Sequence, residues 1–316
     1  MRSRIVHFLK QQSTFVSGEE LSKALNVSRA MVWKCIEELR ADGYEIAAIS
    51  HNGYHLTSSP DKLLAEEVQF GLGTKKFGCQ VHYFDSVSST MDEAFRLGME
   101  GAPEGTVVVT ETQTKGRGRL GRTWASPKGK GIYFSIVLRP TCSAADAARL
   151  TLAAAVAVSE ATEKVSGLQP RIKWPNDLLL NDKKVCGILT ELRAEVDRAQ
   201  FVIVGFGLNV NNTASQLLPE AVSLREVKGE RVSRVALLQQ ILRSFEERYL
   251  AIPSEGYGPV FEEWRRRSAT LGRRVRFVER QKTFEGTAID LAEDGGLMVK
   301  LASGEVVKRM AGDILL

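Results

Sequence analysis

The first 60 residues carry hydrophobic positions at helical spacing, followed by hydrophobic positions that alternate with polar ones. Ser17 is placed to cap a helix that ends near Leu25, and Ser28 is placed to cap a second helix that runs to about Asp42. The alternating positions then surround an Asn-Gly pair at 52–53, which is typical of a tight hairpin. The pattern predicts two helices joined by a short turn and then a two-stranded hairpin.

Two helices joined in this way have helix-turn-helix spacing. With the hairpin as a wing, they resemble a winged helix-turn-helix DNA-binding domain over residues 1–60. The second helix would enter the major groove, where Ser28, Arg29 and Lys34 point away from the apolar stripe. Trp33 faces outward as well. Because any small helical domain contains capped amphipathic helices, a supporting role for this segment stays open.

A polar, proline-bearing linker at 57–64 precedes a longer segment, residues 65–268, in which strands and helices mix. Short returns such as the one at 181–182 predict a largely antiparallel sheet with helices on one side, an α+β layout. Residues 144–165 predict a long alanine-rich helix. Strands are predicted at 106–112, 131–140, 171–174, 177–180, 184–192 and 201–210.

Residues 271–316 alternate short strands with turns and predict a small barrel. The whole chain of 316 residues has 43% hydrophobic and 26% charged content, and its most apolar stretch is too short to cross a bilayer. We therefore expect a cytoplasmic protein that does not contact the membrane. The cysteines lie far apart, so buried thiols are expected rather than a zinc site or a disulfide framework. They are Cys35, Cys79, Cys142 and Cys186.

Residues 114–130 contain six Lys/Arg and no acid, and glycines interrupt them. Gly116, Gly118 and Gly121 match the G-x-G-x-x-G spacing of a dinucleotide-binding fold, but a strand follows them where that fold needs a helix. The Gly-Lys-Ser/Thr of a Walker loop and the His-Arg-Asp and Asp-Phe-Gly motifs of kinases are absent. The segment therefore predicts a mobile loop that is not a dinucleotide fingerprint.

This arginine loop, residues 114–124, presents Arg117, Arg119 and Arg122, whose planar guanidinium groups suit phosphate and carboxylate oxygens. Because like charges so close together repel each other, we expect the loop to be disordered when empty and ordered on an oxygen-rich anion. The alternative is a solvated basic loop without a ligand.

A second motif favours the ligand. Residues 173–177, Lys-Trp-Pro-Asn-Asp, end a strand at a proline turn and leave polar groups exposed. The chain returns through Lys183 and Lys184 to Gly187. One such lysine is commonly no more than a charge on a hairpin turn, whereas a purely structural role for both is less common, so the motif favours an anion ligand.

The stretches GRGRLGRTW, KWPNDLLLNDKKVCGILTE and GFGLNVN follow SVSSTMDEA and the helix-turn-helix in this order. In all three segments the chain resembles biotin protein ligases of the bifunctional type that also repress the biotin operon. The resemblance implies a central fold related to class II aminoacyl-tRNA synthetases and an SH3-like barrel at the C-terminus. It also implies that biotin and ATP, with Mg²⁺, give biotinyl-5'-AMP. The biotin would then pass to one lysine of the carrier protein of acetyl-CoA carboxylase or of another biotin-dependent carboxylase.

The resemblance assigns roles to single residues. Catalysis would depend on Arg119, Lys184 and Asp177, and Mg²⁺ would be bound mainly by the ATP phosphates, with Asp177 as the candidate protein ligand. Met91 stands where the family often has asparagine. Biotin would be bound by Ser89, Thr90, Met91, Gln113, Arg117, Gly118, Arg119, Lys184 and Gly187. ATP and the adenylate would be bound by Arg119, Arg122, Trp124, Asn176, Asn209, Asn212 and Ser223.

The resemblance further implies that biotinyl-5'-AMP promotes a homodimer, which then binds two-fold operator DNA. Two alternatives stay open. One is a biotin-sensing regulator without catalysis, against which the intact Arg117, Arg119 and Lys184 argue. The other is a ligase whose N-terminal segment only supports the core.

Overall fold

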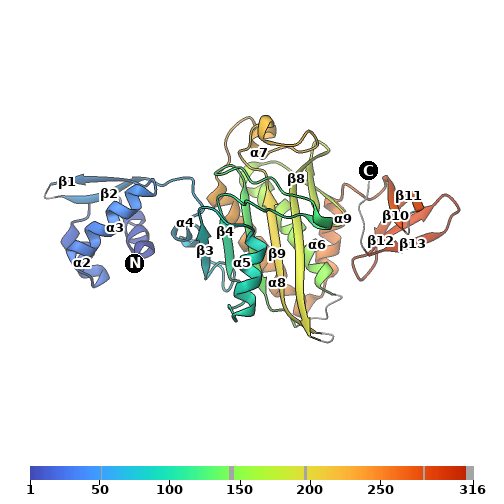
Figure 1. The fold of residues 1–316 in the computed structure, drawn as a ribbon, viewed down its shortest axis with the longest axis horizontal. Coiled ribbons are helices and arrows are strands. Elements are labelled where there is room, and N and C mark those ends of the chain that lie inside the picture. The colour runs from blue at the N-terminus through green and yellow to red at the C-terminus, as the bar shows by residue number, and fades with distance from the viewer. Residues whose placement is uncertain (51, 142–145, 196–197, 280–281, 311–316) are drawn as a thin grey trace. The chain divides into compact units, whose positions relative to one another are not determined.

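The computed structural model describes residues 1–50, 52–141, 146–195, 198–279 and 282–310 (Figure 1). Contacts within the chain divide it into two compact units, Met1–Gly71 and Leu72–Leu316. Each unit has its own buried core.

The N-terminal unit contains the predicted winged helix-turn-helix. Ser17 Oγ accepts a hydrogen bond from the Glu20 N–H at 3.1 Å, and Ser28 Oγ accepts one from the Met31 N–H at 3.2 Å. Both predicted helix caps are therefore confirmed. The two strands pair antiparallel as a wing. The elements are α1 (Arg2–Lys10), α2 (Gly18–Leu25), α3 (Arg29–Ala41), β1 (Glu45–Ile49), β2 (Gly53–Ser58) and α4 (Ala65–Gln69).

This unit extends beyond the expected boundary at residue 60. Helix α4 packs on α1 through ion pairs of Glu66 with Arg2 at 2.9 Å and of Glu67 with Lys10 at 2.6 Å. Both leucines of the expected linker, at 63 and 64, are buried. The linker and α4 therefore lie in the N-terminal unit, although the sequence had placed α4 in the central segment.

A seven-stranded sheet in the order β3-β4-β5-β9-β8-β7-β6 is the scaffold of the second unit (Figure 1). Its first two strands are parallel and its other neighbours are antiparallel, which confirms the largely antiparallel prediction. The strands are β3 (Val81–Phe84), β4 (Val107–Thr110), β5 (Ile132–Leu138), β6 (Arg171–Lys173), β7 (Asp177–Leu180), β8 (Lys183–Glu195) and β9 (Arg198–Leu208). The helices are α5 (Thr90–Met99), α6 (Ala147–Ser166), α7 (Leu224–Lys228), α8 (Arg234–Glu255) and α9 (Gly258–Arg267).

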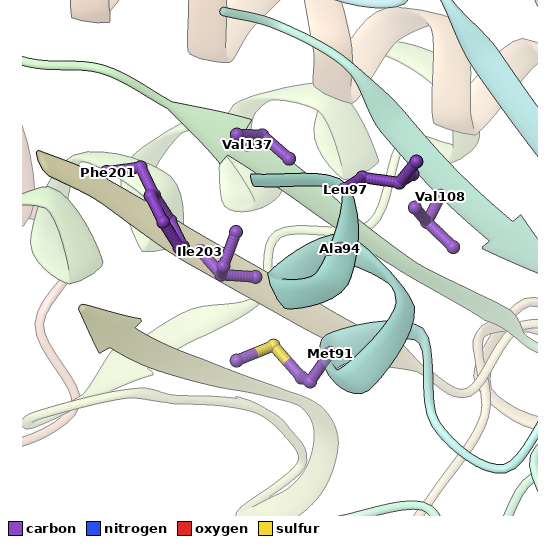
Figure 2. Packing of buried hydrophobic residues seen from close by; sticks show 7 residues of the cluster. All are labelled: Met91, Ala94, Leu97, Val108, Val137, Phe201 and Ile203. Carbon is purple, nitrogen blue, oxygen red and sulfur yellow. The ribbon is translucent and has the colours of Figure 1, made fainter. Parts of the chain in front are cut away.

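Helices cover both faces of this sheet, so the prediction of helices on one side is wrong. Figure 2 shows α5 packed through Ala94 on Val137 and Ile203 of the central strands. Successive side chains of a strand point to opposite faces. Phe206 of β9 therefore lies on the other face, where its ring meets Phe245 of α8. Helix α6 packs against α8 and also contacts β8 and β9, so α6 and α8 lie together on the face opposite α5.

The C-terminal strands pair in chain order as an antiparallel four-stranded sheet, which confirms the predicted run of short strands. Trp174 connects this sheet to the central one. Its backbone N–H donates to Thr270 Oγ1 at 2.9 Å and its indole Nε1 donates to the Gly295 carbonyl at 3.1 Å. The Trp174-Pro175 peptide bond is cis. The strands are β10 (Arg274–Glu279), β11 (Lys282–Leu291), β12 (Leu297–Leu301) and β13 (Val306–Arg309).

The other expectations from composition have mixed outcomes. Within the described residues, no helix is both long and apolar enough to span a membrane. Cys35 and Cys186 are buried free thiols as expected, whereas Cys79 is exposed, because it follows a surface turn before β3. Cys142 and the predicted start of the long helix at 144 lie outside the described residues.

Glu263 offers a test of the ion pairing on α9, a helix that packs against α6. Hydrogen bonding by Arg266 lowers the pKa of the Glu263 carboxyl to about 2, with further support from Arg267. A pKa lowered by folding stabilises the protein above the unfolded value near 4.5, and this contribution disappears as the pH falls towards 2. We expect Glu263→Gln to lower the melting temperature at pH 7, and we expect the difference from the wild type to shrink below about pH 4.5 and to vanish only near pH 2.

Thermal melts between pH 7 and pH 2 measure this difference. Glu262→Gln, an exposed neighbour on the same helix, is the control. A difference that stays constant over the whole range would contradict the assignment.

Candidate active site

A pocket of about 480 Å³ opens on the sheet face that carries α5. Strands β8 and β9 form its floor, and the arginine loop and the segment 217–221 border it. Six cationic side chains line it against three carboxylates, so the pocket attracts anions. The charged residues are Arg117, Arg119, Arg122, Lys173, Lys184 and Arg273, with Asp177, Asp182 and Glu220.

Glycines flatten the floor of this pocket. Gly187 of β8 and Gly207 of β9 lie directly opposite each other in the antiparallel ladder. The Trp124 indole lies against both: a Cβ at Gly187 would come within 2.9 Å of its ring, and a Cβ at Gly207 would overlap it. Gly205 leaves room for the Met91 thioether in the same way. The Gly-Phe-Gly motif therefore serves close approach of aromatic and apolar groups to the backbone.

One end of the pocket is neutral and polar. Gln113 Oε1 accepts hydrogen bonds from Thr90 N at 2.9 Å and from Thr90 Oγ1 at 3.2 Å, and Gln113 Nε2 donates to Ser126 Oγ at 3.1 Å. Ser89 caps helix α5 by accepting from Met91 N. Ser135 Oγ donates to Thr90 Oγ1 at 2.8 Å. These buried donors and acceptors suit a ligand with amide-like groups.

Met91 belongs to the hydrophobic support of that end. Its side chain is buried in the cluster between α5 and the sheet, and it also lines the pocket (Figure 2). The thioether offers only a weak acceptor, so Met91 contributes apolar contact where an asparagine would donate a hydrogen bond.

The arginine loop folds back on itself at the cationic end. The Gly118 N–H donates to the Arg122 carbonyl at 2.7 Å, and Leu120 adopts a left-handed conformation (φ 55) with its side chain 75% exposed. Arg117 forms an ion pair with Asp92 at 2.7 Å and reaches Glu191 at 3.5 Å. The expected ordering of this loop by a ligand stays a prediction.

The second motif supplies partners for the other cations. Arg119 Nη1 donates to Asn176 Oδ1 at 2.8 Å, and Lys184 Nζ pairs with Asp177 Oδ1 at 2.8 Å. Asn176 Nδ2 in turn donates to the Ile188 carbonyl at 2.9 Å, which fixes the amide. Lys184 Nζ also lies 5.4 Å from the Trp124 ring centre, within cation–π range. The arginine loop and the second motif thus meet, although Arg119 and Asn176 are 57 positions apart in the sequence.

Two groups near this end are chemically constrained. Burial raises the pKa of the Cys186 thiol, so this cysteine stays protonated and unreactive at neutral pH. The indole Nε1 of Trp124 is buried and has no hydrogen-bond partner among the described residues. A buried donor in this position suits an acceptor on a ligand.

The expected adenine side is only partly at the pocket. Asn209 lines it, and its Nδ2 donates to the Val222 carbonyl at 3.3 Å. Asn212 and Ser223 are buried and are not among the lining residues. Ser223 instead caps α7, accepting from the Glu226 N–H at 3.2 Å and donating to the Asn212 carbonyl at 2.8 Å.

Sequence reasoning missed several lining residues. Leu217 and Leu218 belong to no recognisable motif, and Arg273 comes from the C-terminal segment, where nothing in the sequence indicates proximity to the pocket. Apart from Asn212 and Ser223, every residue expected to bind biotin or ATP or to act in catalysis lines the pocket. These residues are Ser89, Thr90, Met91, Gln113, Arg117, Gly118, Arg119, Arg122, Trp124, Asn176, Asp177, Lys184, Gly187 and Asn209.

No cluster of three or more His, Cys, Asp or Glu side chains suited to a metal ion occurs in the described part of the chain. Asp177 is a carboxylate of the pocket lining that pairs with Lys184 and accepts a hydrogen bond from Asn176 Nδ2 at 3.2 Å. A divalent cation in this pocket would therefore need most of its ligands from a phosphate-bearing substrate and from water.

On the N-terminal unit, α3 presents a polar surface for a second function. Ser28, Arg29 and Lys34 are exposed as expected, while Val32 and Ile36 are buried on the opposite side. Trp33 is also exposed, at 60%. The exposed side combines cations with an aromatic ring, a composition suited to nucleic acid.

Comparison with known proteins gives matches to three family models. Residues 83–209 match the biotin/lipoate A/B protein ligase family, residues 2–55 match a helix-turn-helix domain, and residues 270–316 match the biotin protein ligase C-terminal domain. The central match contains both cationic motifs.

Relatives that match along nearly their whole length agree with these domain matches. The chain is 41% identical over 319 residues to the bifunctional ligase/repressor BirA of Bacillus spizizenii, covering 99% of this chain and 98% of the relative. It is 29% identical to that of Escherichia coli, covering 96% and 93%. Among solved structures, the biotin protein ligase from Aquifex aeolicus in complex with biotin and ATP superimposes with a TM-score of 0.64 at 29% identity, over 75% of this chain and 98% of that one. Similarity along nearly the whole of both chains shows that this protein belongs to the family of bifunctional biotin protein ligases and repressors.

Proposed function

We propose that this chain activates biotin with ATP to biotinyl-5'-AMP and transfers the biotin to one lysine of a biotin carboxyl carrier protein. The observation that carries the proposal is the two-ended pocket. Its neutral end, at Ser89, Thr90 and Gln113, matches the ureido group of biotin, and its cationic end, at Arg119 and Lys184, matches a carboxylate and a phosphate.

In the first step, an oxygen of the biotin carboxylate attacks the α-phosphorus of ATP, the bond to the β-phosphate oxygen breaks, and pyrophosphate leaves. No nucleophile from the protein is required. The residues must bring two anions together and stabilise the charge that develops at phosphorus. Arg119 and Lys184 would exchange their present partners, Asn176 and Asp177, for ligand oxygens.

Other residues would support this step. Arg117 and Gly118 would close on the biotin carboxylate, Arg122 would contact the ATP phosphates, and Trp124 would cover the ligand with its unpartnered Nε1 available to an acceptor. Asn176 and Asn209 would face the nucleotide. Mg²⁺, which neutralises charge on the phosphates, fits a site made mainly by those phosphates with the Asp177 carboxylate as its protein ligand.

In the second step, the ε-amine of the carrier lysine attacks the acyl carbon of biotinyl-5'-AMP, an amide bond forms, and AMP leaves. Asp177 would position the amine and the loop would keep water from the mixed anhydride until the carrier docks. The carrier proteins of acetyl-CoA carboxylase and of other biotin-dependent carboxylases are the expected partners.

The finer fold assignments belong to the same proposal. A mixed seven-stranded sheet with helices supports kinship with class II aminoacyl-tRNA synthetases, and the antiparallel strands β10–β13 support an SH3-like barrel. The N-terminal unit would bind operator DNA in the cytoplasm as part of a homodimer formed with biotinyl-5'-AMP, with α3 in the major groove.

Removal of the central cations tests the catalytic assignment. Purified protein is incubated with ATP, Mg²⁺, biotin and a carrier domain, and mass spectrometry follows the gain of one biotin. We expect Arg119→Ala and Lys184→Ala each to slow the gain by about 10²–10³-fold, the usual effect of losing one transition-state donor.

Arg274→Ala, which removes an exposed arginine outside the pocket lining, serves as the control and should keep wild-type activity. Wild-type rates of biotin transfer in both pocket variants would contradict the catalytic roles assigned to Arg119 and Lys184. An inactive wild type that still binds biotin would favour the non-catalytic sensor.

Fluorescence anisotropy with DNA from the biotin-operon promoter tests the repressor role. We expect biotin plus ATP to tighten binding, because the adenylate would favour the dimer and the dimer would engage two half-sites. Arg29→Ala and Lys34→Ala should each weaken binding severalfold through lost DNA contacts, whereas Lys23→Ala on α2 should not. Binding that biotin plus ATP leaves unchanged would refute the coupling, and no binding at all would favour the supporting role.

A further inference from the structure

One ion pair of the central unit is buried completely. Arg234 Nη1 lies 2.7 Å from Glu111 Oε2, with side chains only 1% and 2% exposed. Burying two charges is costly, and a well-packed apolar pair of similar size usually stabilises a fold as well. Neither residue lines the pocket, and stability alone is a weak reason for this pair. The positions of the two residues suggest another reason.

Glu111 and Arg234 together control the base of the segment that bears the arginine loop. Glu111 directly follows β4, and its backbone carbonyl accepts a hydrogen bond from the Gly129 N–H at 3.3 Å. Arg234 Nη1 also donates to the carbonyl of Gly131 at 3.2 Å, and Gly131 directly precedes β5. One guanidinium on the first turn of α8 therefore holds both ends of residues 111–131.

Hydrogen bonds connect this base to the ligand-facing residues. Thr112 Oγ1 donates to the Ser126 carbonyl at 2.6 Å, and Gln113 Nε2 donates to Ser126 Oγ at 3.1 Å. Further along, the Trp124 N–H donates to the Gly116 carbonyl at 2.9 Å. A shift of Glu111 would therefore displace Gln113 and Trp124, which face the pocket, without touching a ligand itself.

We propose that Arg234 is a positioning residue: through Glu111 and Gly131 it fixes the two ends of the arginine-loop segment and thereby sets the place of Gln113 and Trp124 in the pocket. The inference rests on the proposed function for its kinetic consequence only. Its structural consequence, a firmly held loop base, applies whatever the ligand is. Because the pair acts on ground-state geometry, its loss should raise KM for biotin more than it lowers kcat.

The test replaces the pair with apolar residues of similar size, Arg234→Met with Glu111→Met, so that no charge is left buried alone. A matched control removes a second ion pair of the same helix, Arg248→Met with Glu160→Met, which joins α8 to α6 through two hydrogen bonds. Melting temperature, KM for biotin and kcat are measured in the biotin-transfer assay. Arg234→Lys is added, because an ammonium retains charge and donors.

We expect the first double variant to raise KM for biotin about tenfold, with kcat changed less than threefold and a melting temperature no lower than that of the control. Arg234→Lys should recover part of the loss. The control should leave KM unchanged. An unchanged KM in the first double variant, or an equal rise in the control, would overturn the proposal.

Trypsin provides a measure that needs no activity. Lys128 and Lys130 lie in the segment that the pair closes, and the Lys130 carbonyl accepts a hydrogen bond from the Asn211 N–H at 2.7 Å. We therefore expect cleavage after these lysines to need local opening of the base. We expect cleavage at least fivefold faster in Arg234→Met/Glu111→Met, and in the isosteric Glu111→Gln should the double variant not fold, with no change in the control. Equal cleavage rates would overturn the inference. If the wild type transfers no biotin, the proposed function fails while this measurement still decides the role of Arg234.

Discussion

Repulsion among cations that converge on one pocket is the constraint on which the site depends. Arg117, Arg119 and Lys184 come from two distant segments, and each has a partner within the protein. Asp92, Asn176 and Asp177 supply those partners. Such contacts are weaker than two-pronged contacts to phosphate or carboxylate oxygens, so an anion can take the partners' place. The pocket therefore carries an excess of positive charge that an anionic ligand would neutralise.

The scaffold explains how cations can stand so close to a binding surface. Opposed glycines on β8 and β9 remove side chains from the floor and let Trp124 approach the backbone. Helices α6 and α8 cover one face of the sheet, and the opposite face, where α5 lies, carries the site. The buried Arg234–Glu111 pair then ties the outer helix to the base of the arginine loop. Packing on one face therefore determines polar geometry on the other.

Local signals in the sequence were sufficient to predict many of the helices and strands. The caps at Ser17 and Ser28, the hairpin wing and six of the seven central strands follow from spacing and turn residues, and the structure confirms them. Strand β3 was not predicted. Helices α8 and α9 were not predicted, although Ser233 and the spacing of apolar residues in α8 carried a signal. The face that each helix covers, the attachment of α4 to α1 and the nearness of Arg273 to the pocket depend on tertiary packing, which periodicity cannot reveal.

Local signals and tertiary packing also divide the residues of the site into those that the sequence could indicate and those that it could not. Motif residues such as Arg119 and Lys184 could be chosen from the sequence because charged and glycine residues in a loop indicate a ligand. Asn212 and Ser223 were chosen by resemblance, but they lie buried away from the pocket lining, where Ser223 caps α7. Arg234 gave no signal at all, because an arginine at a helix start usually lies in solvent.

Calorimetry with two stable analogues of biotinyl-5'-AMP tests the central claim most directly. One analogue keeps an anionic phosphate between biotin and adenosine, and the other has a neutral linker of equal length. If the converging cations form an anion-binding site, the charged analogue binds at least tenfold more tightly than the neutral one. This ratio corresponds to a difference of about 1.4 kcal/mol in binding free energy. Equal affinities for the two analogues would contradict the account.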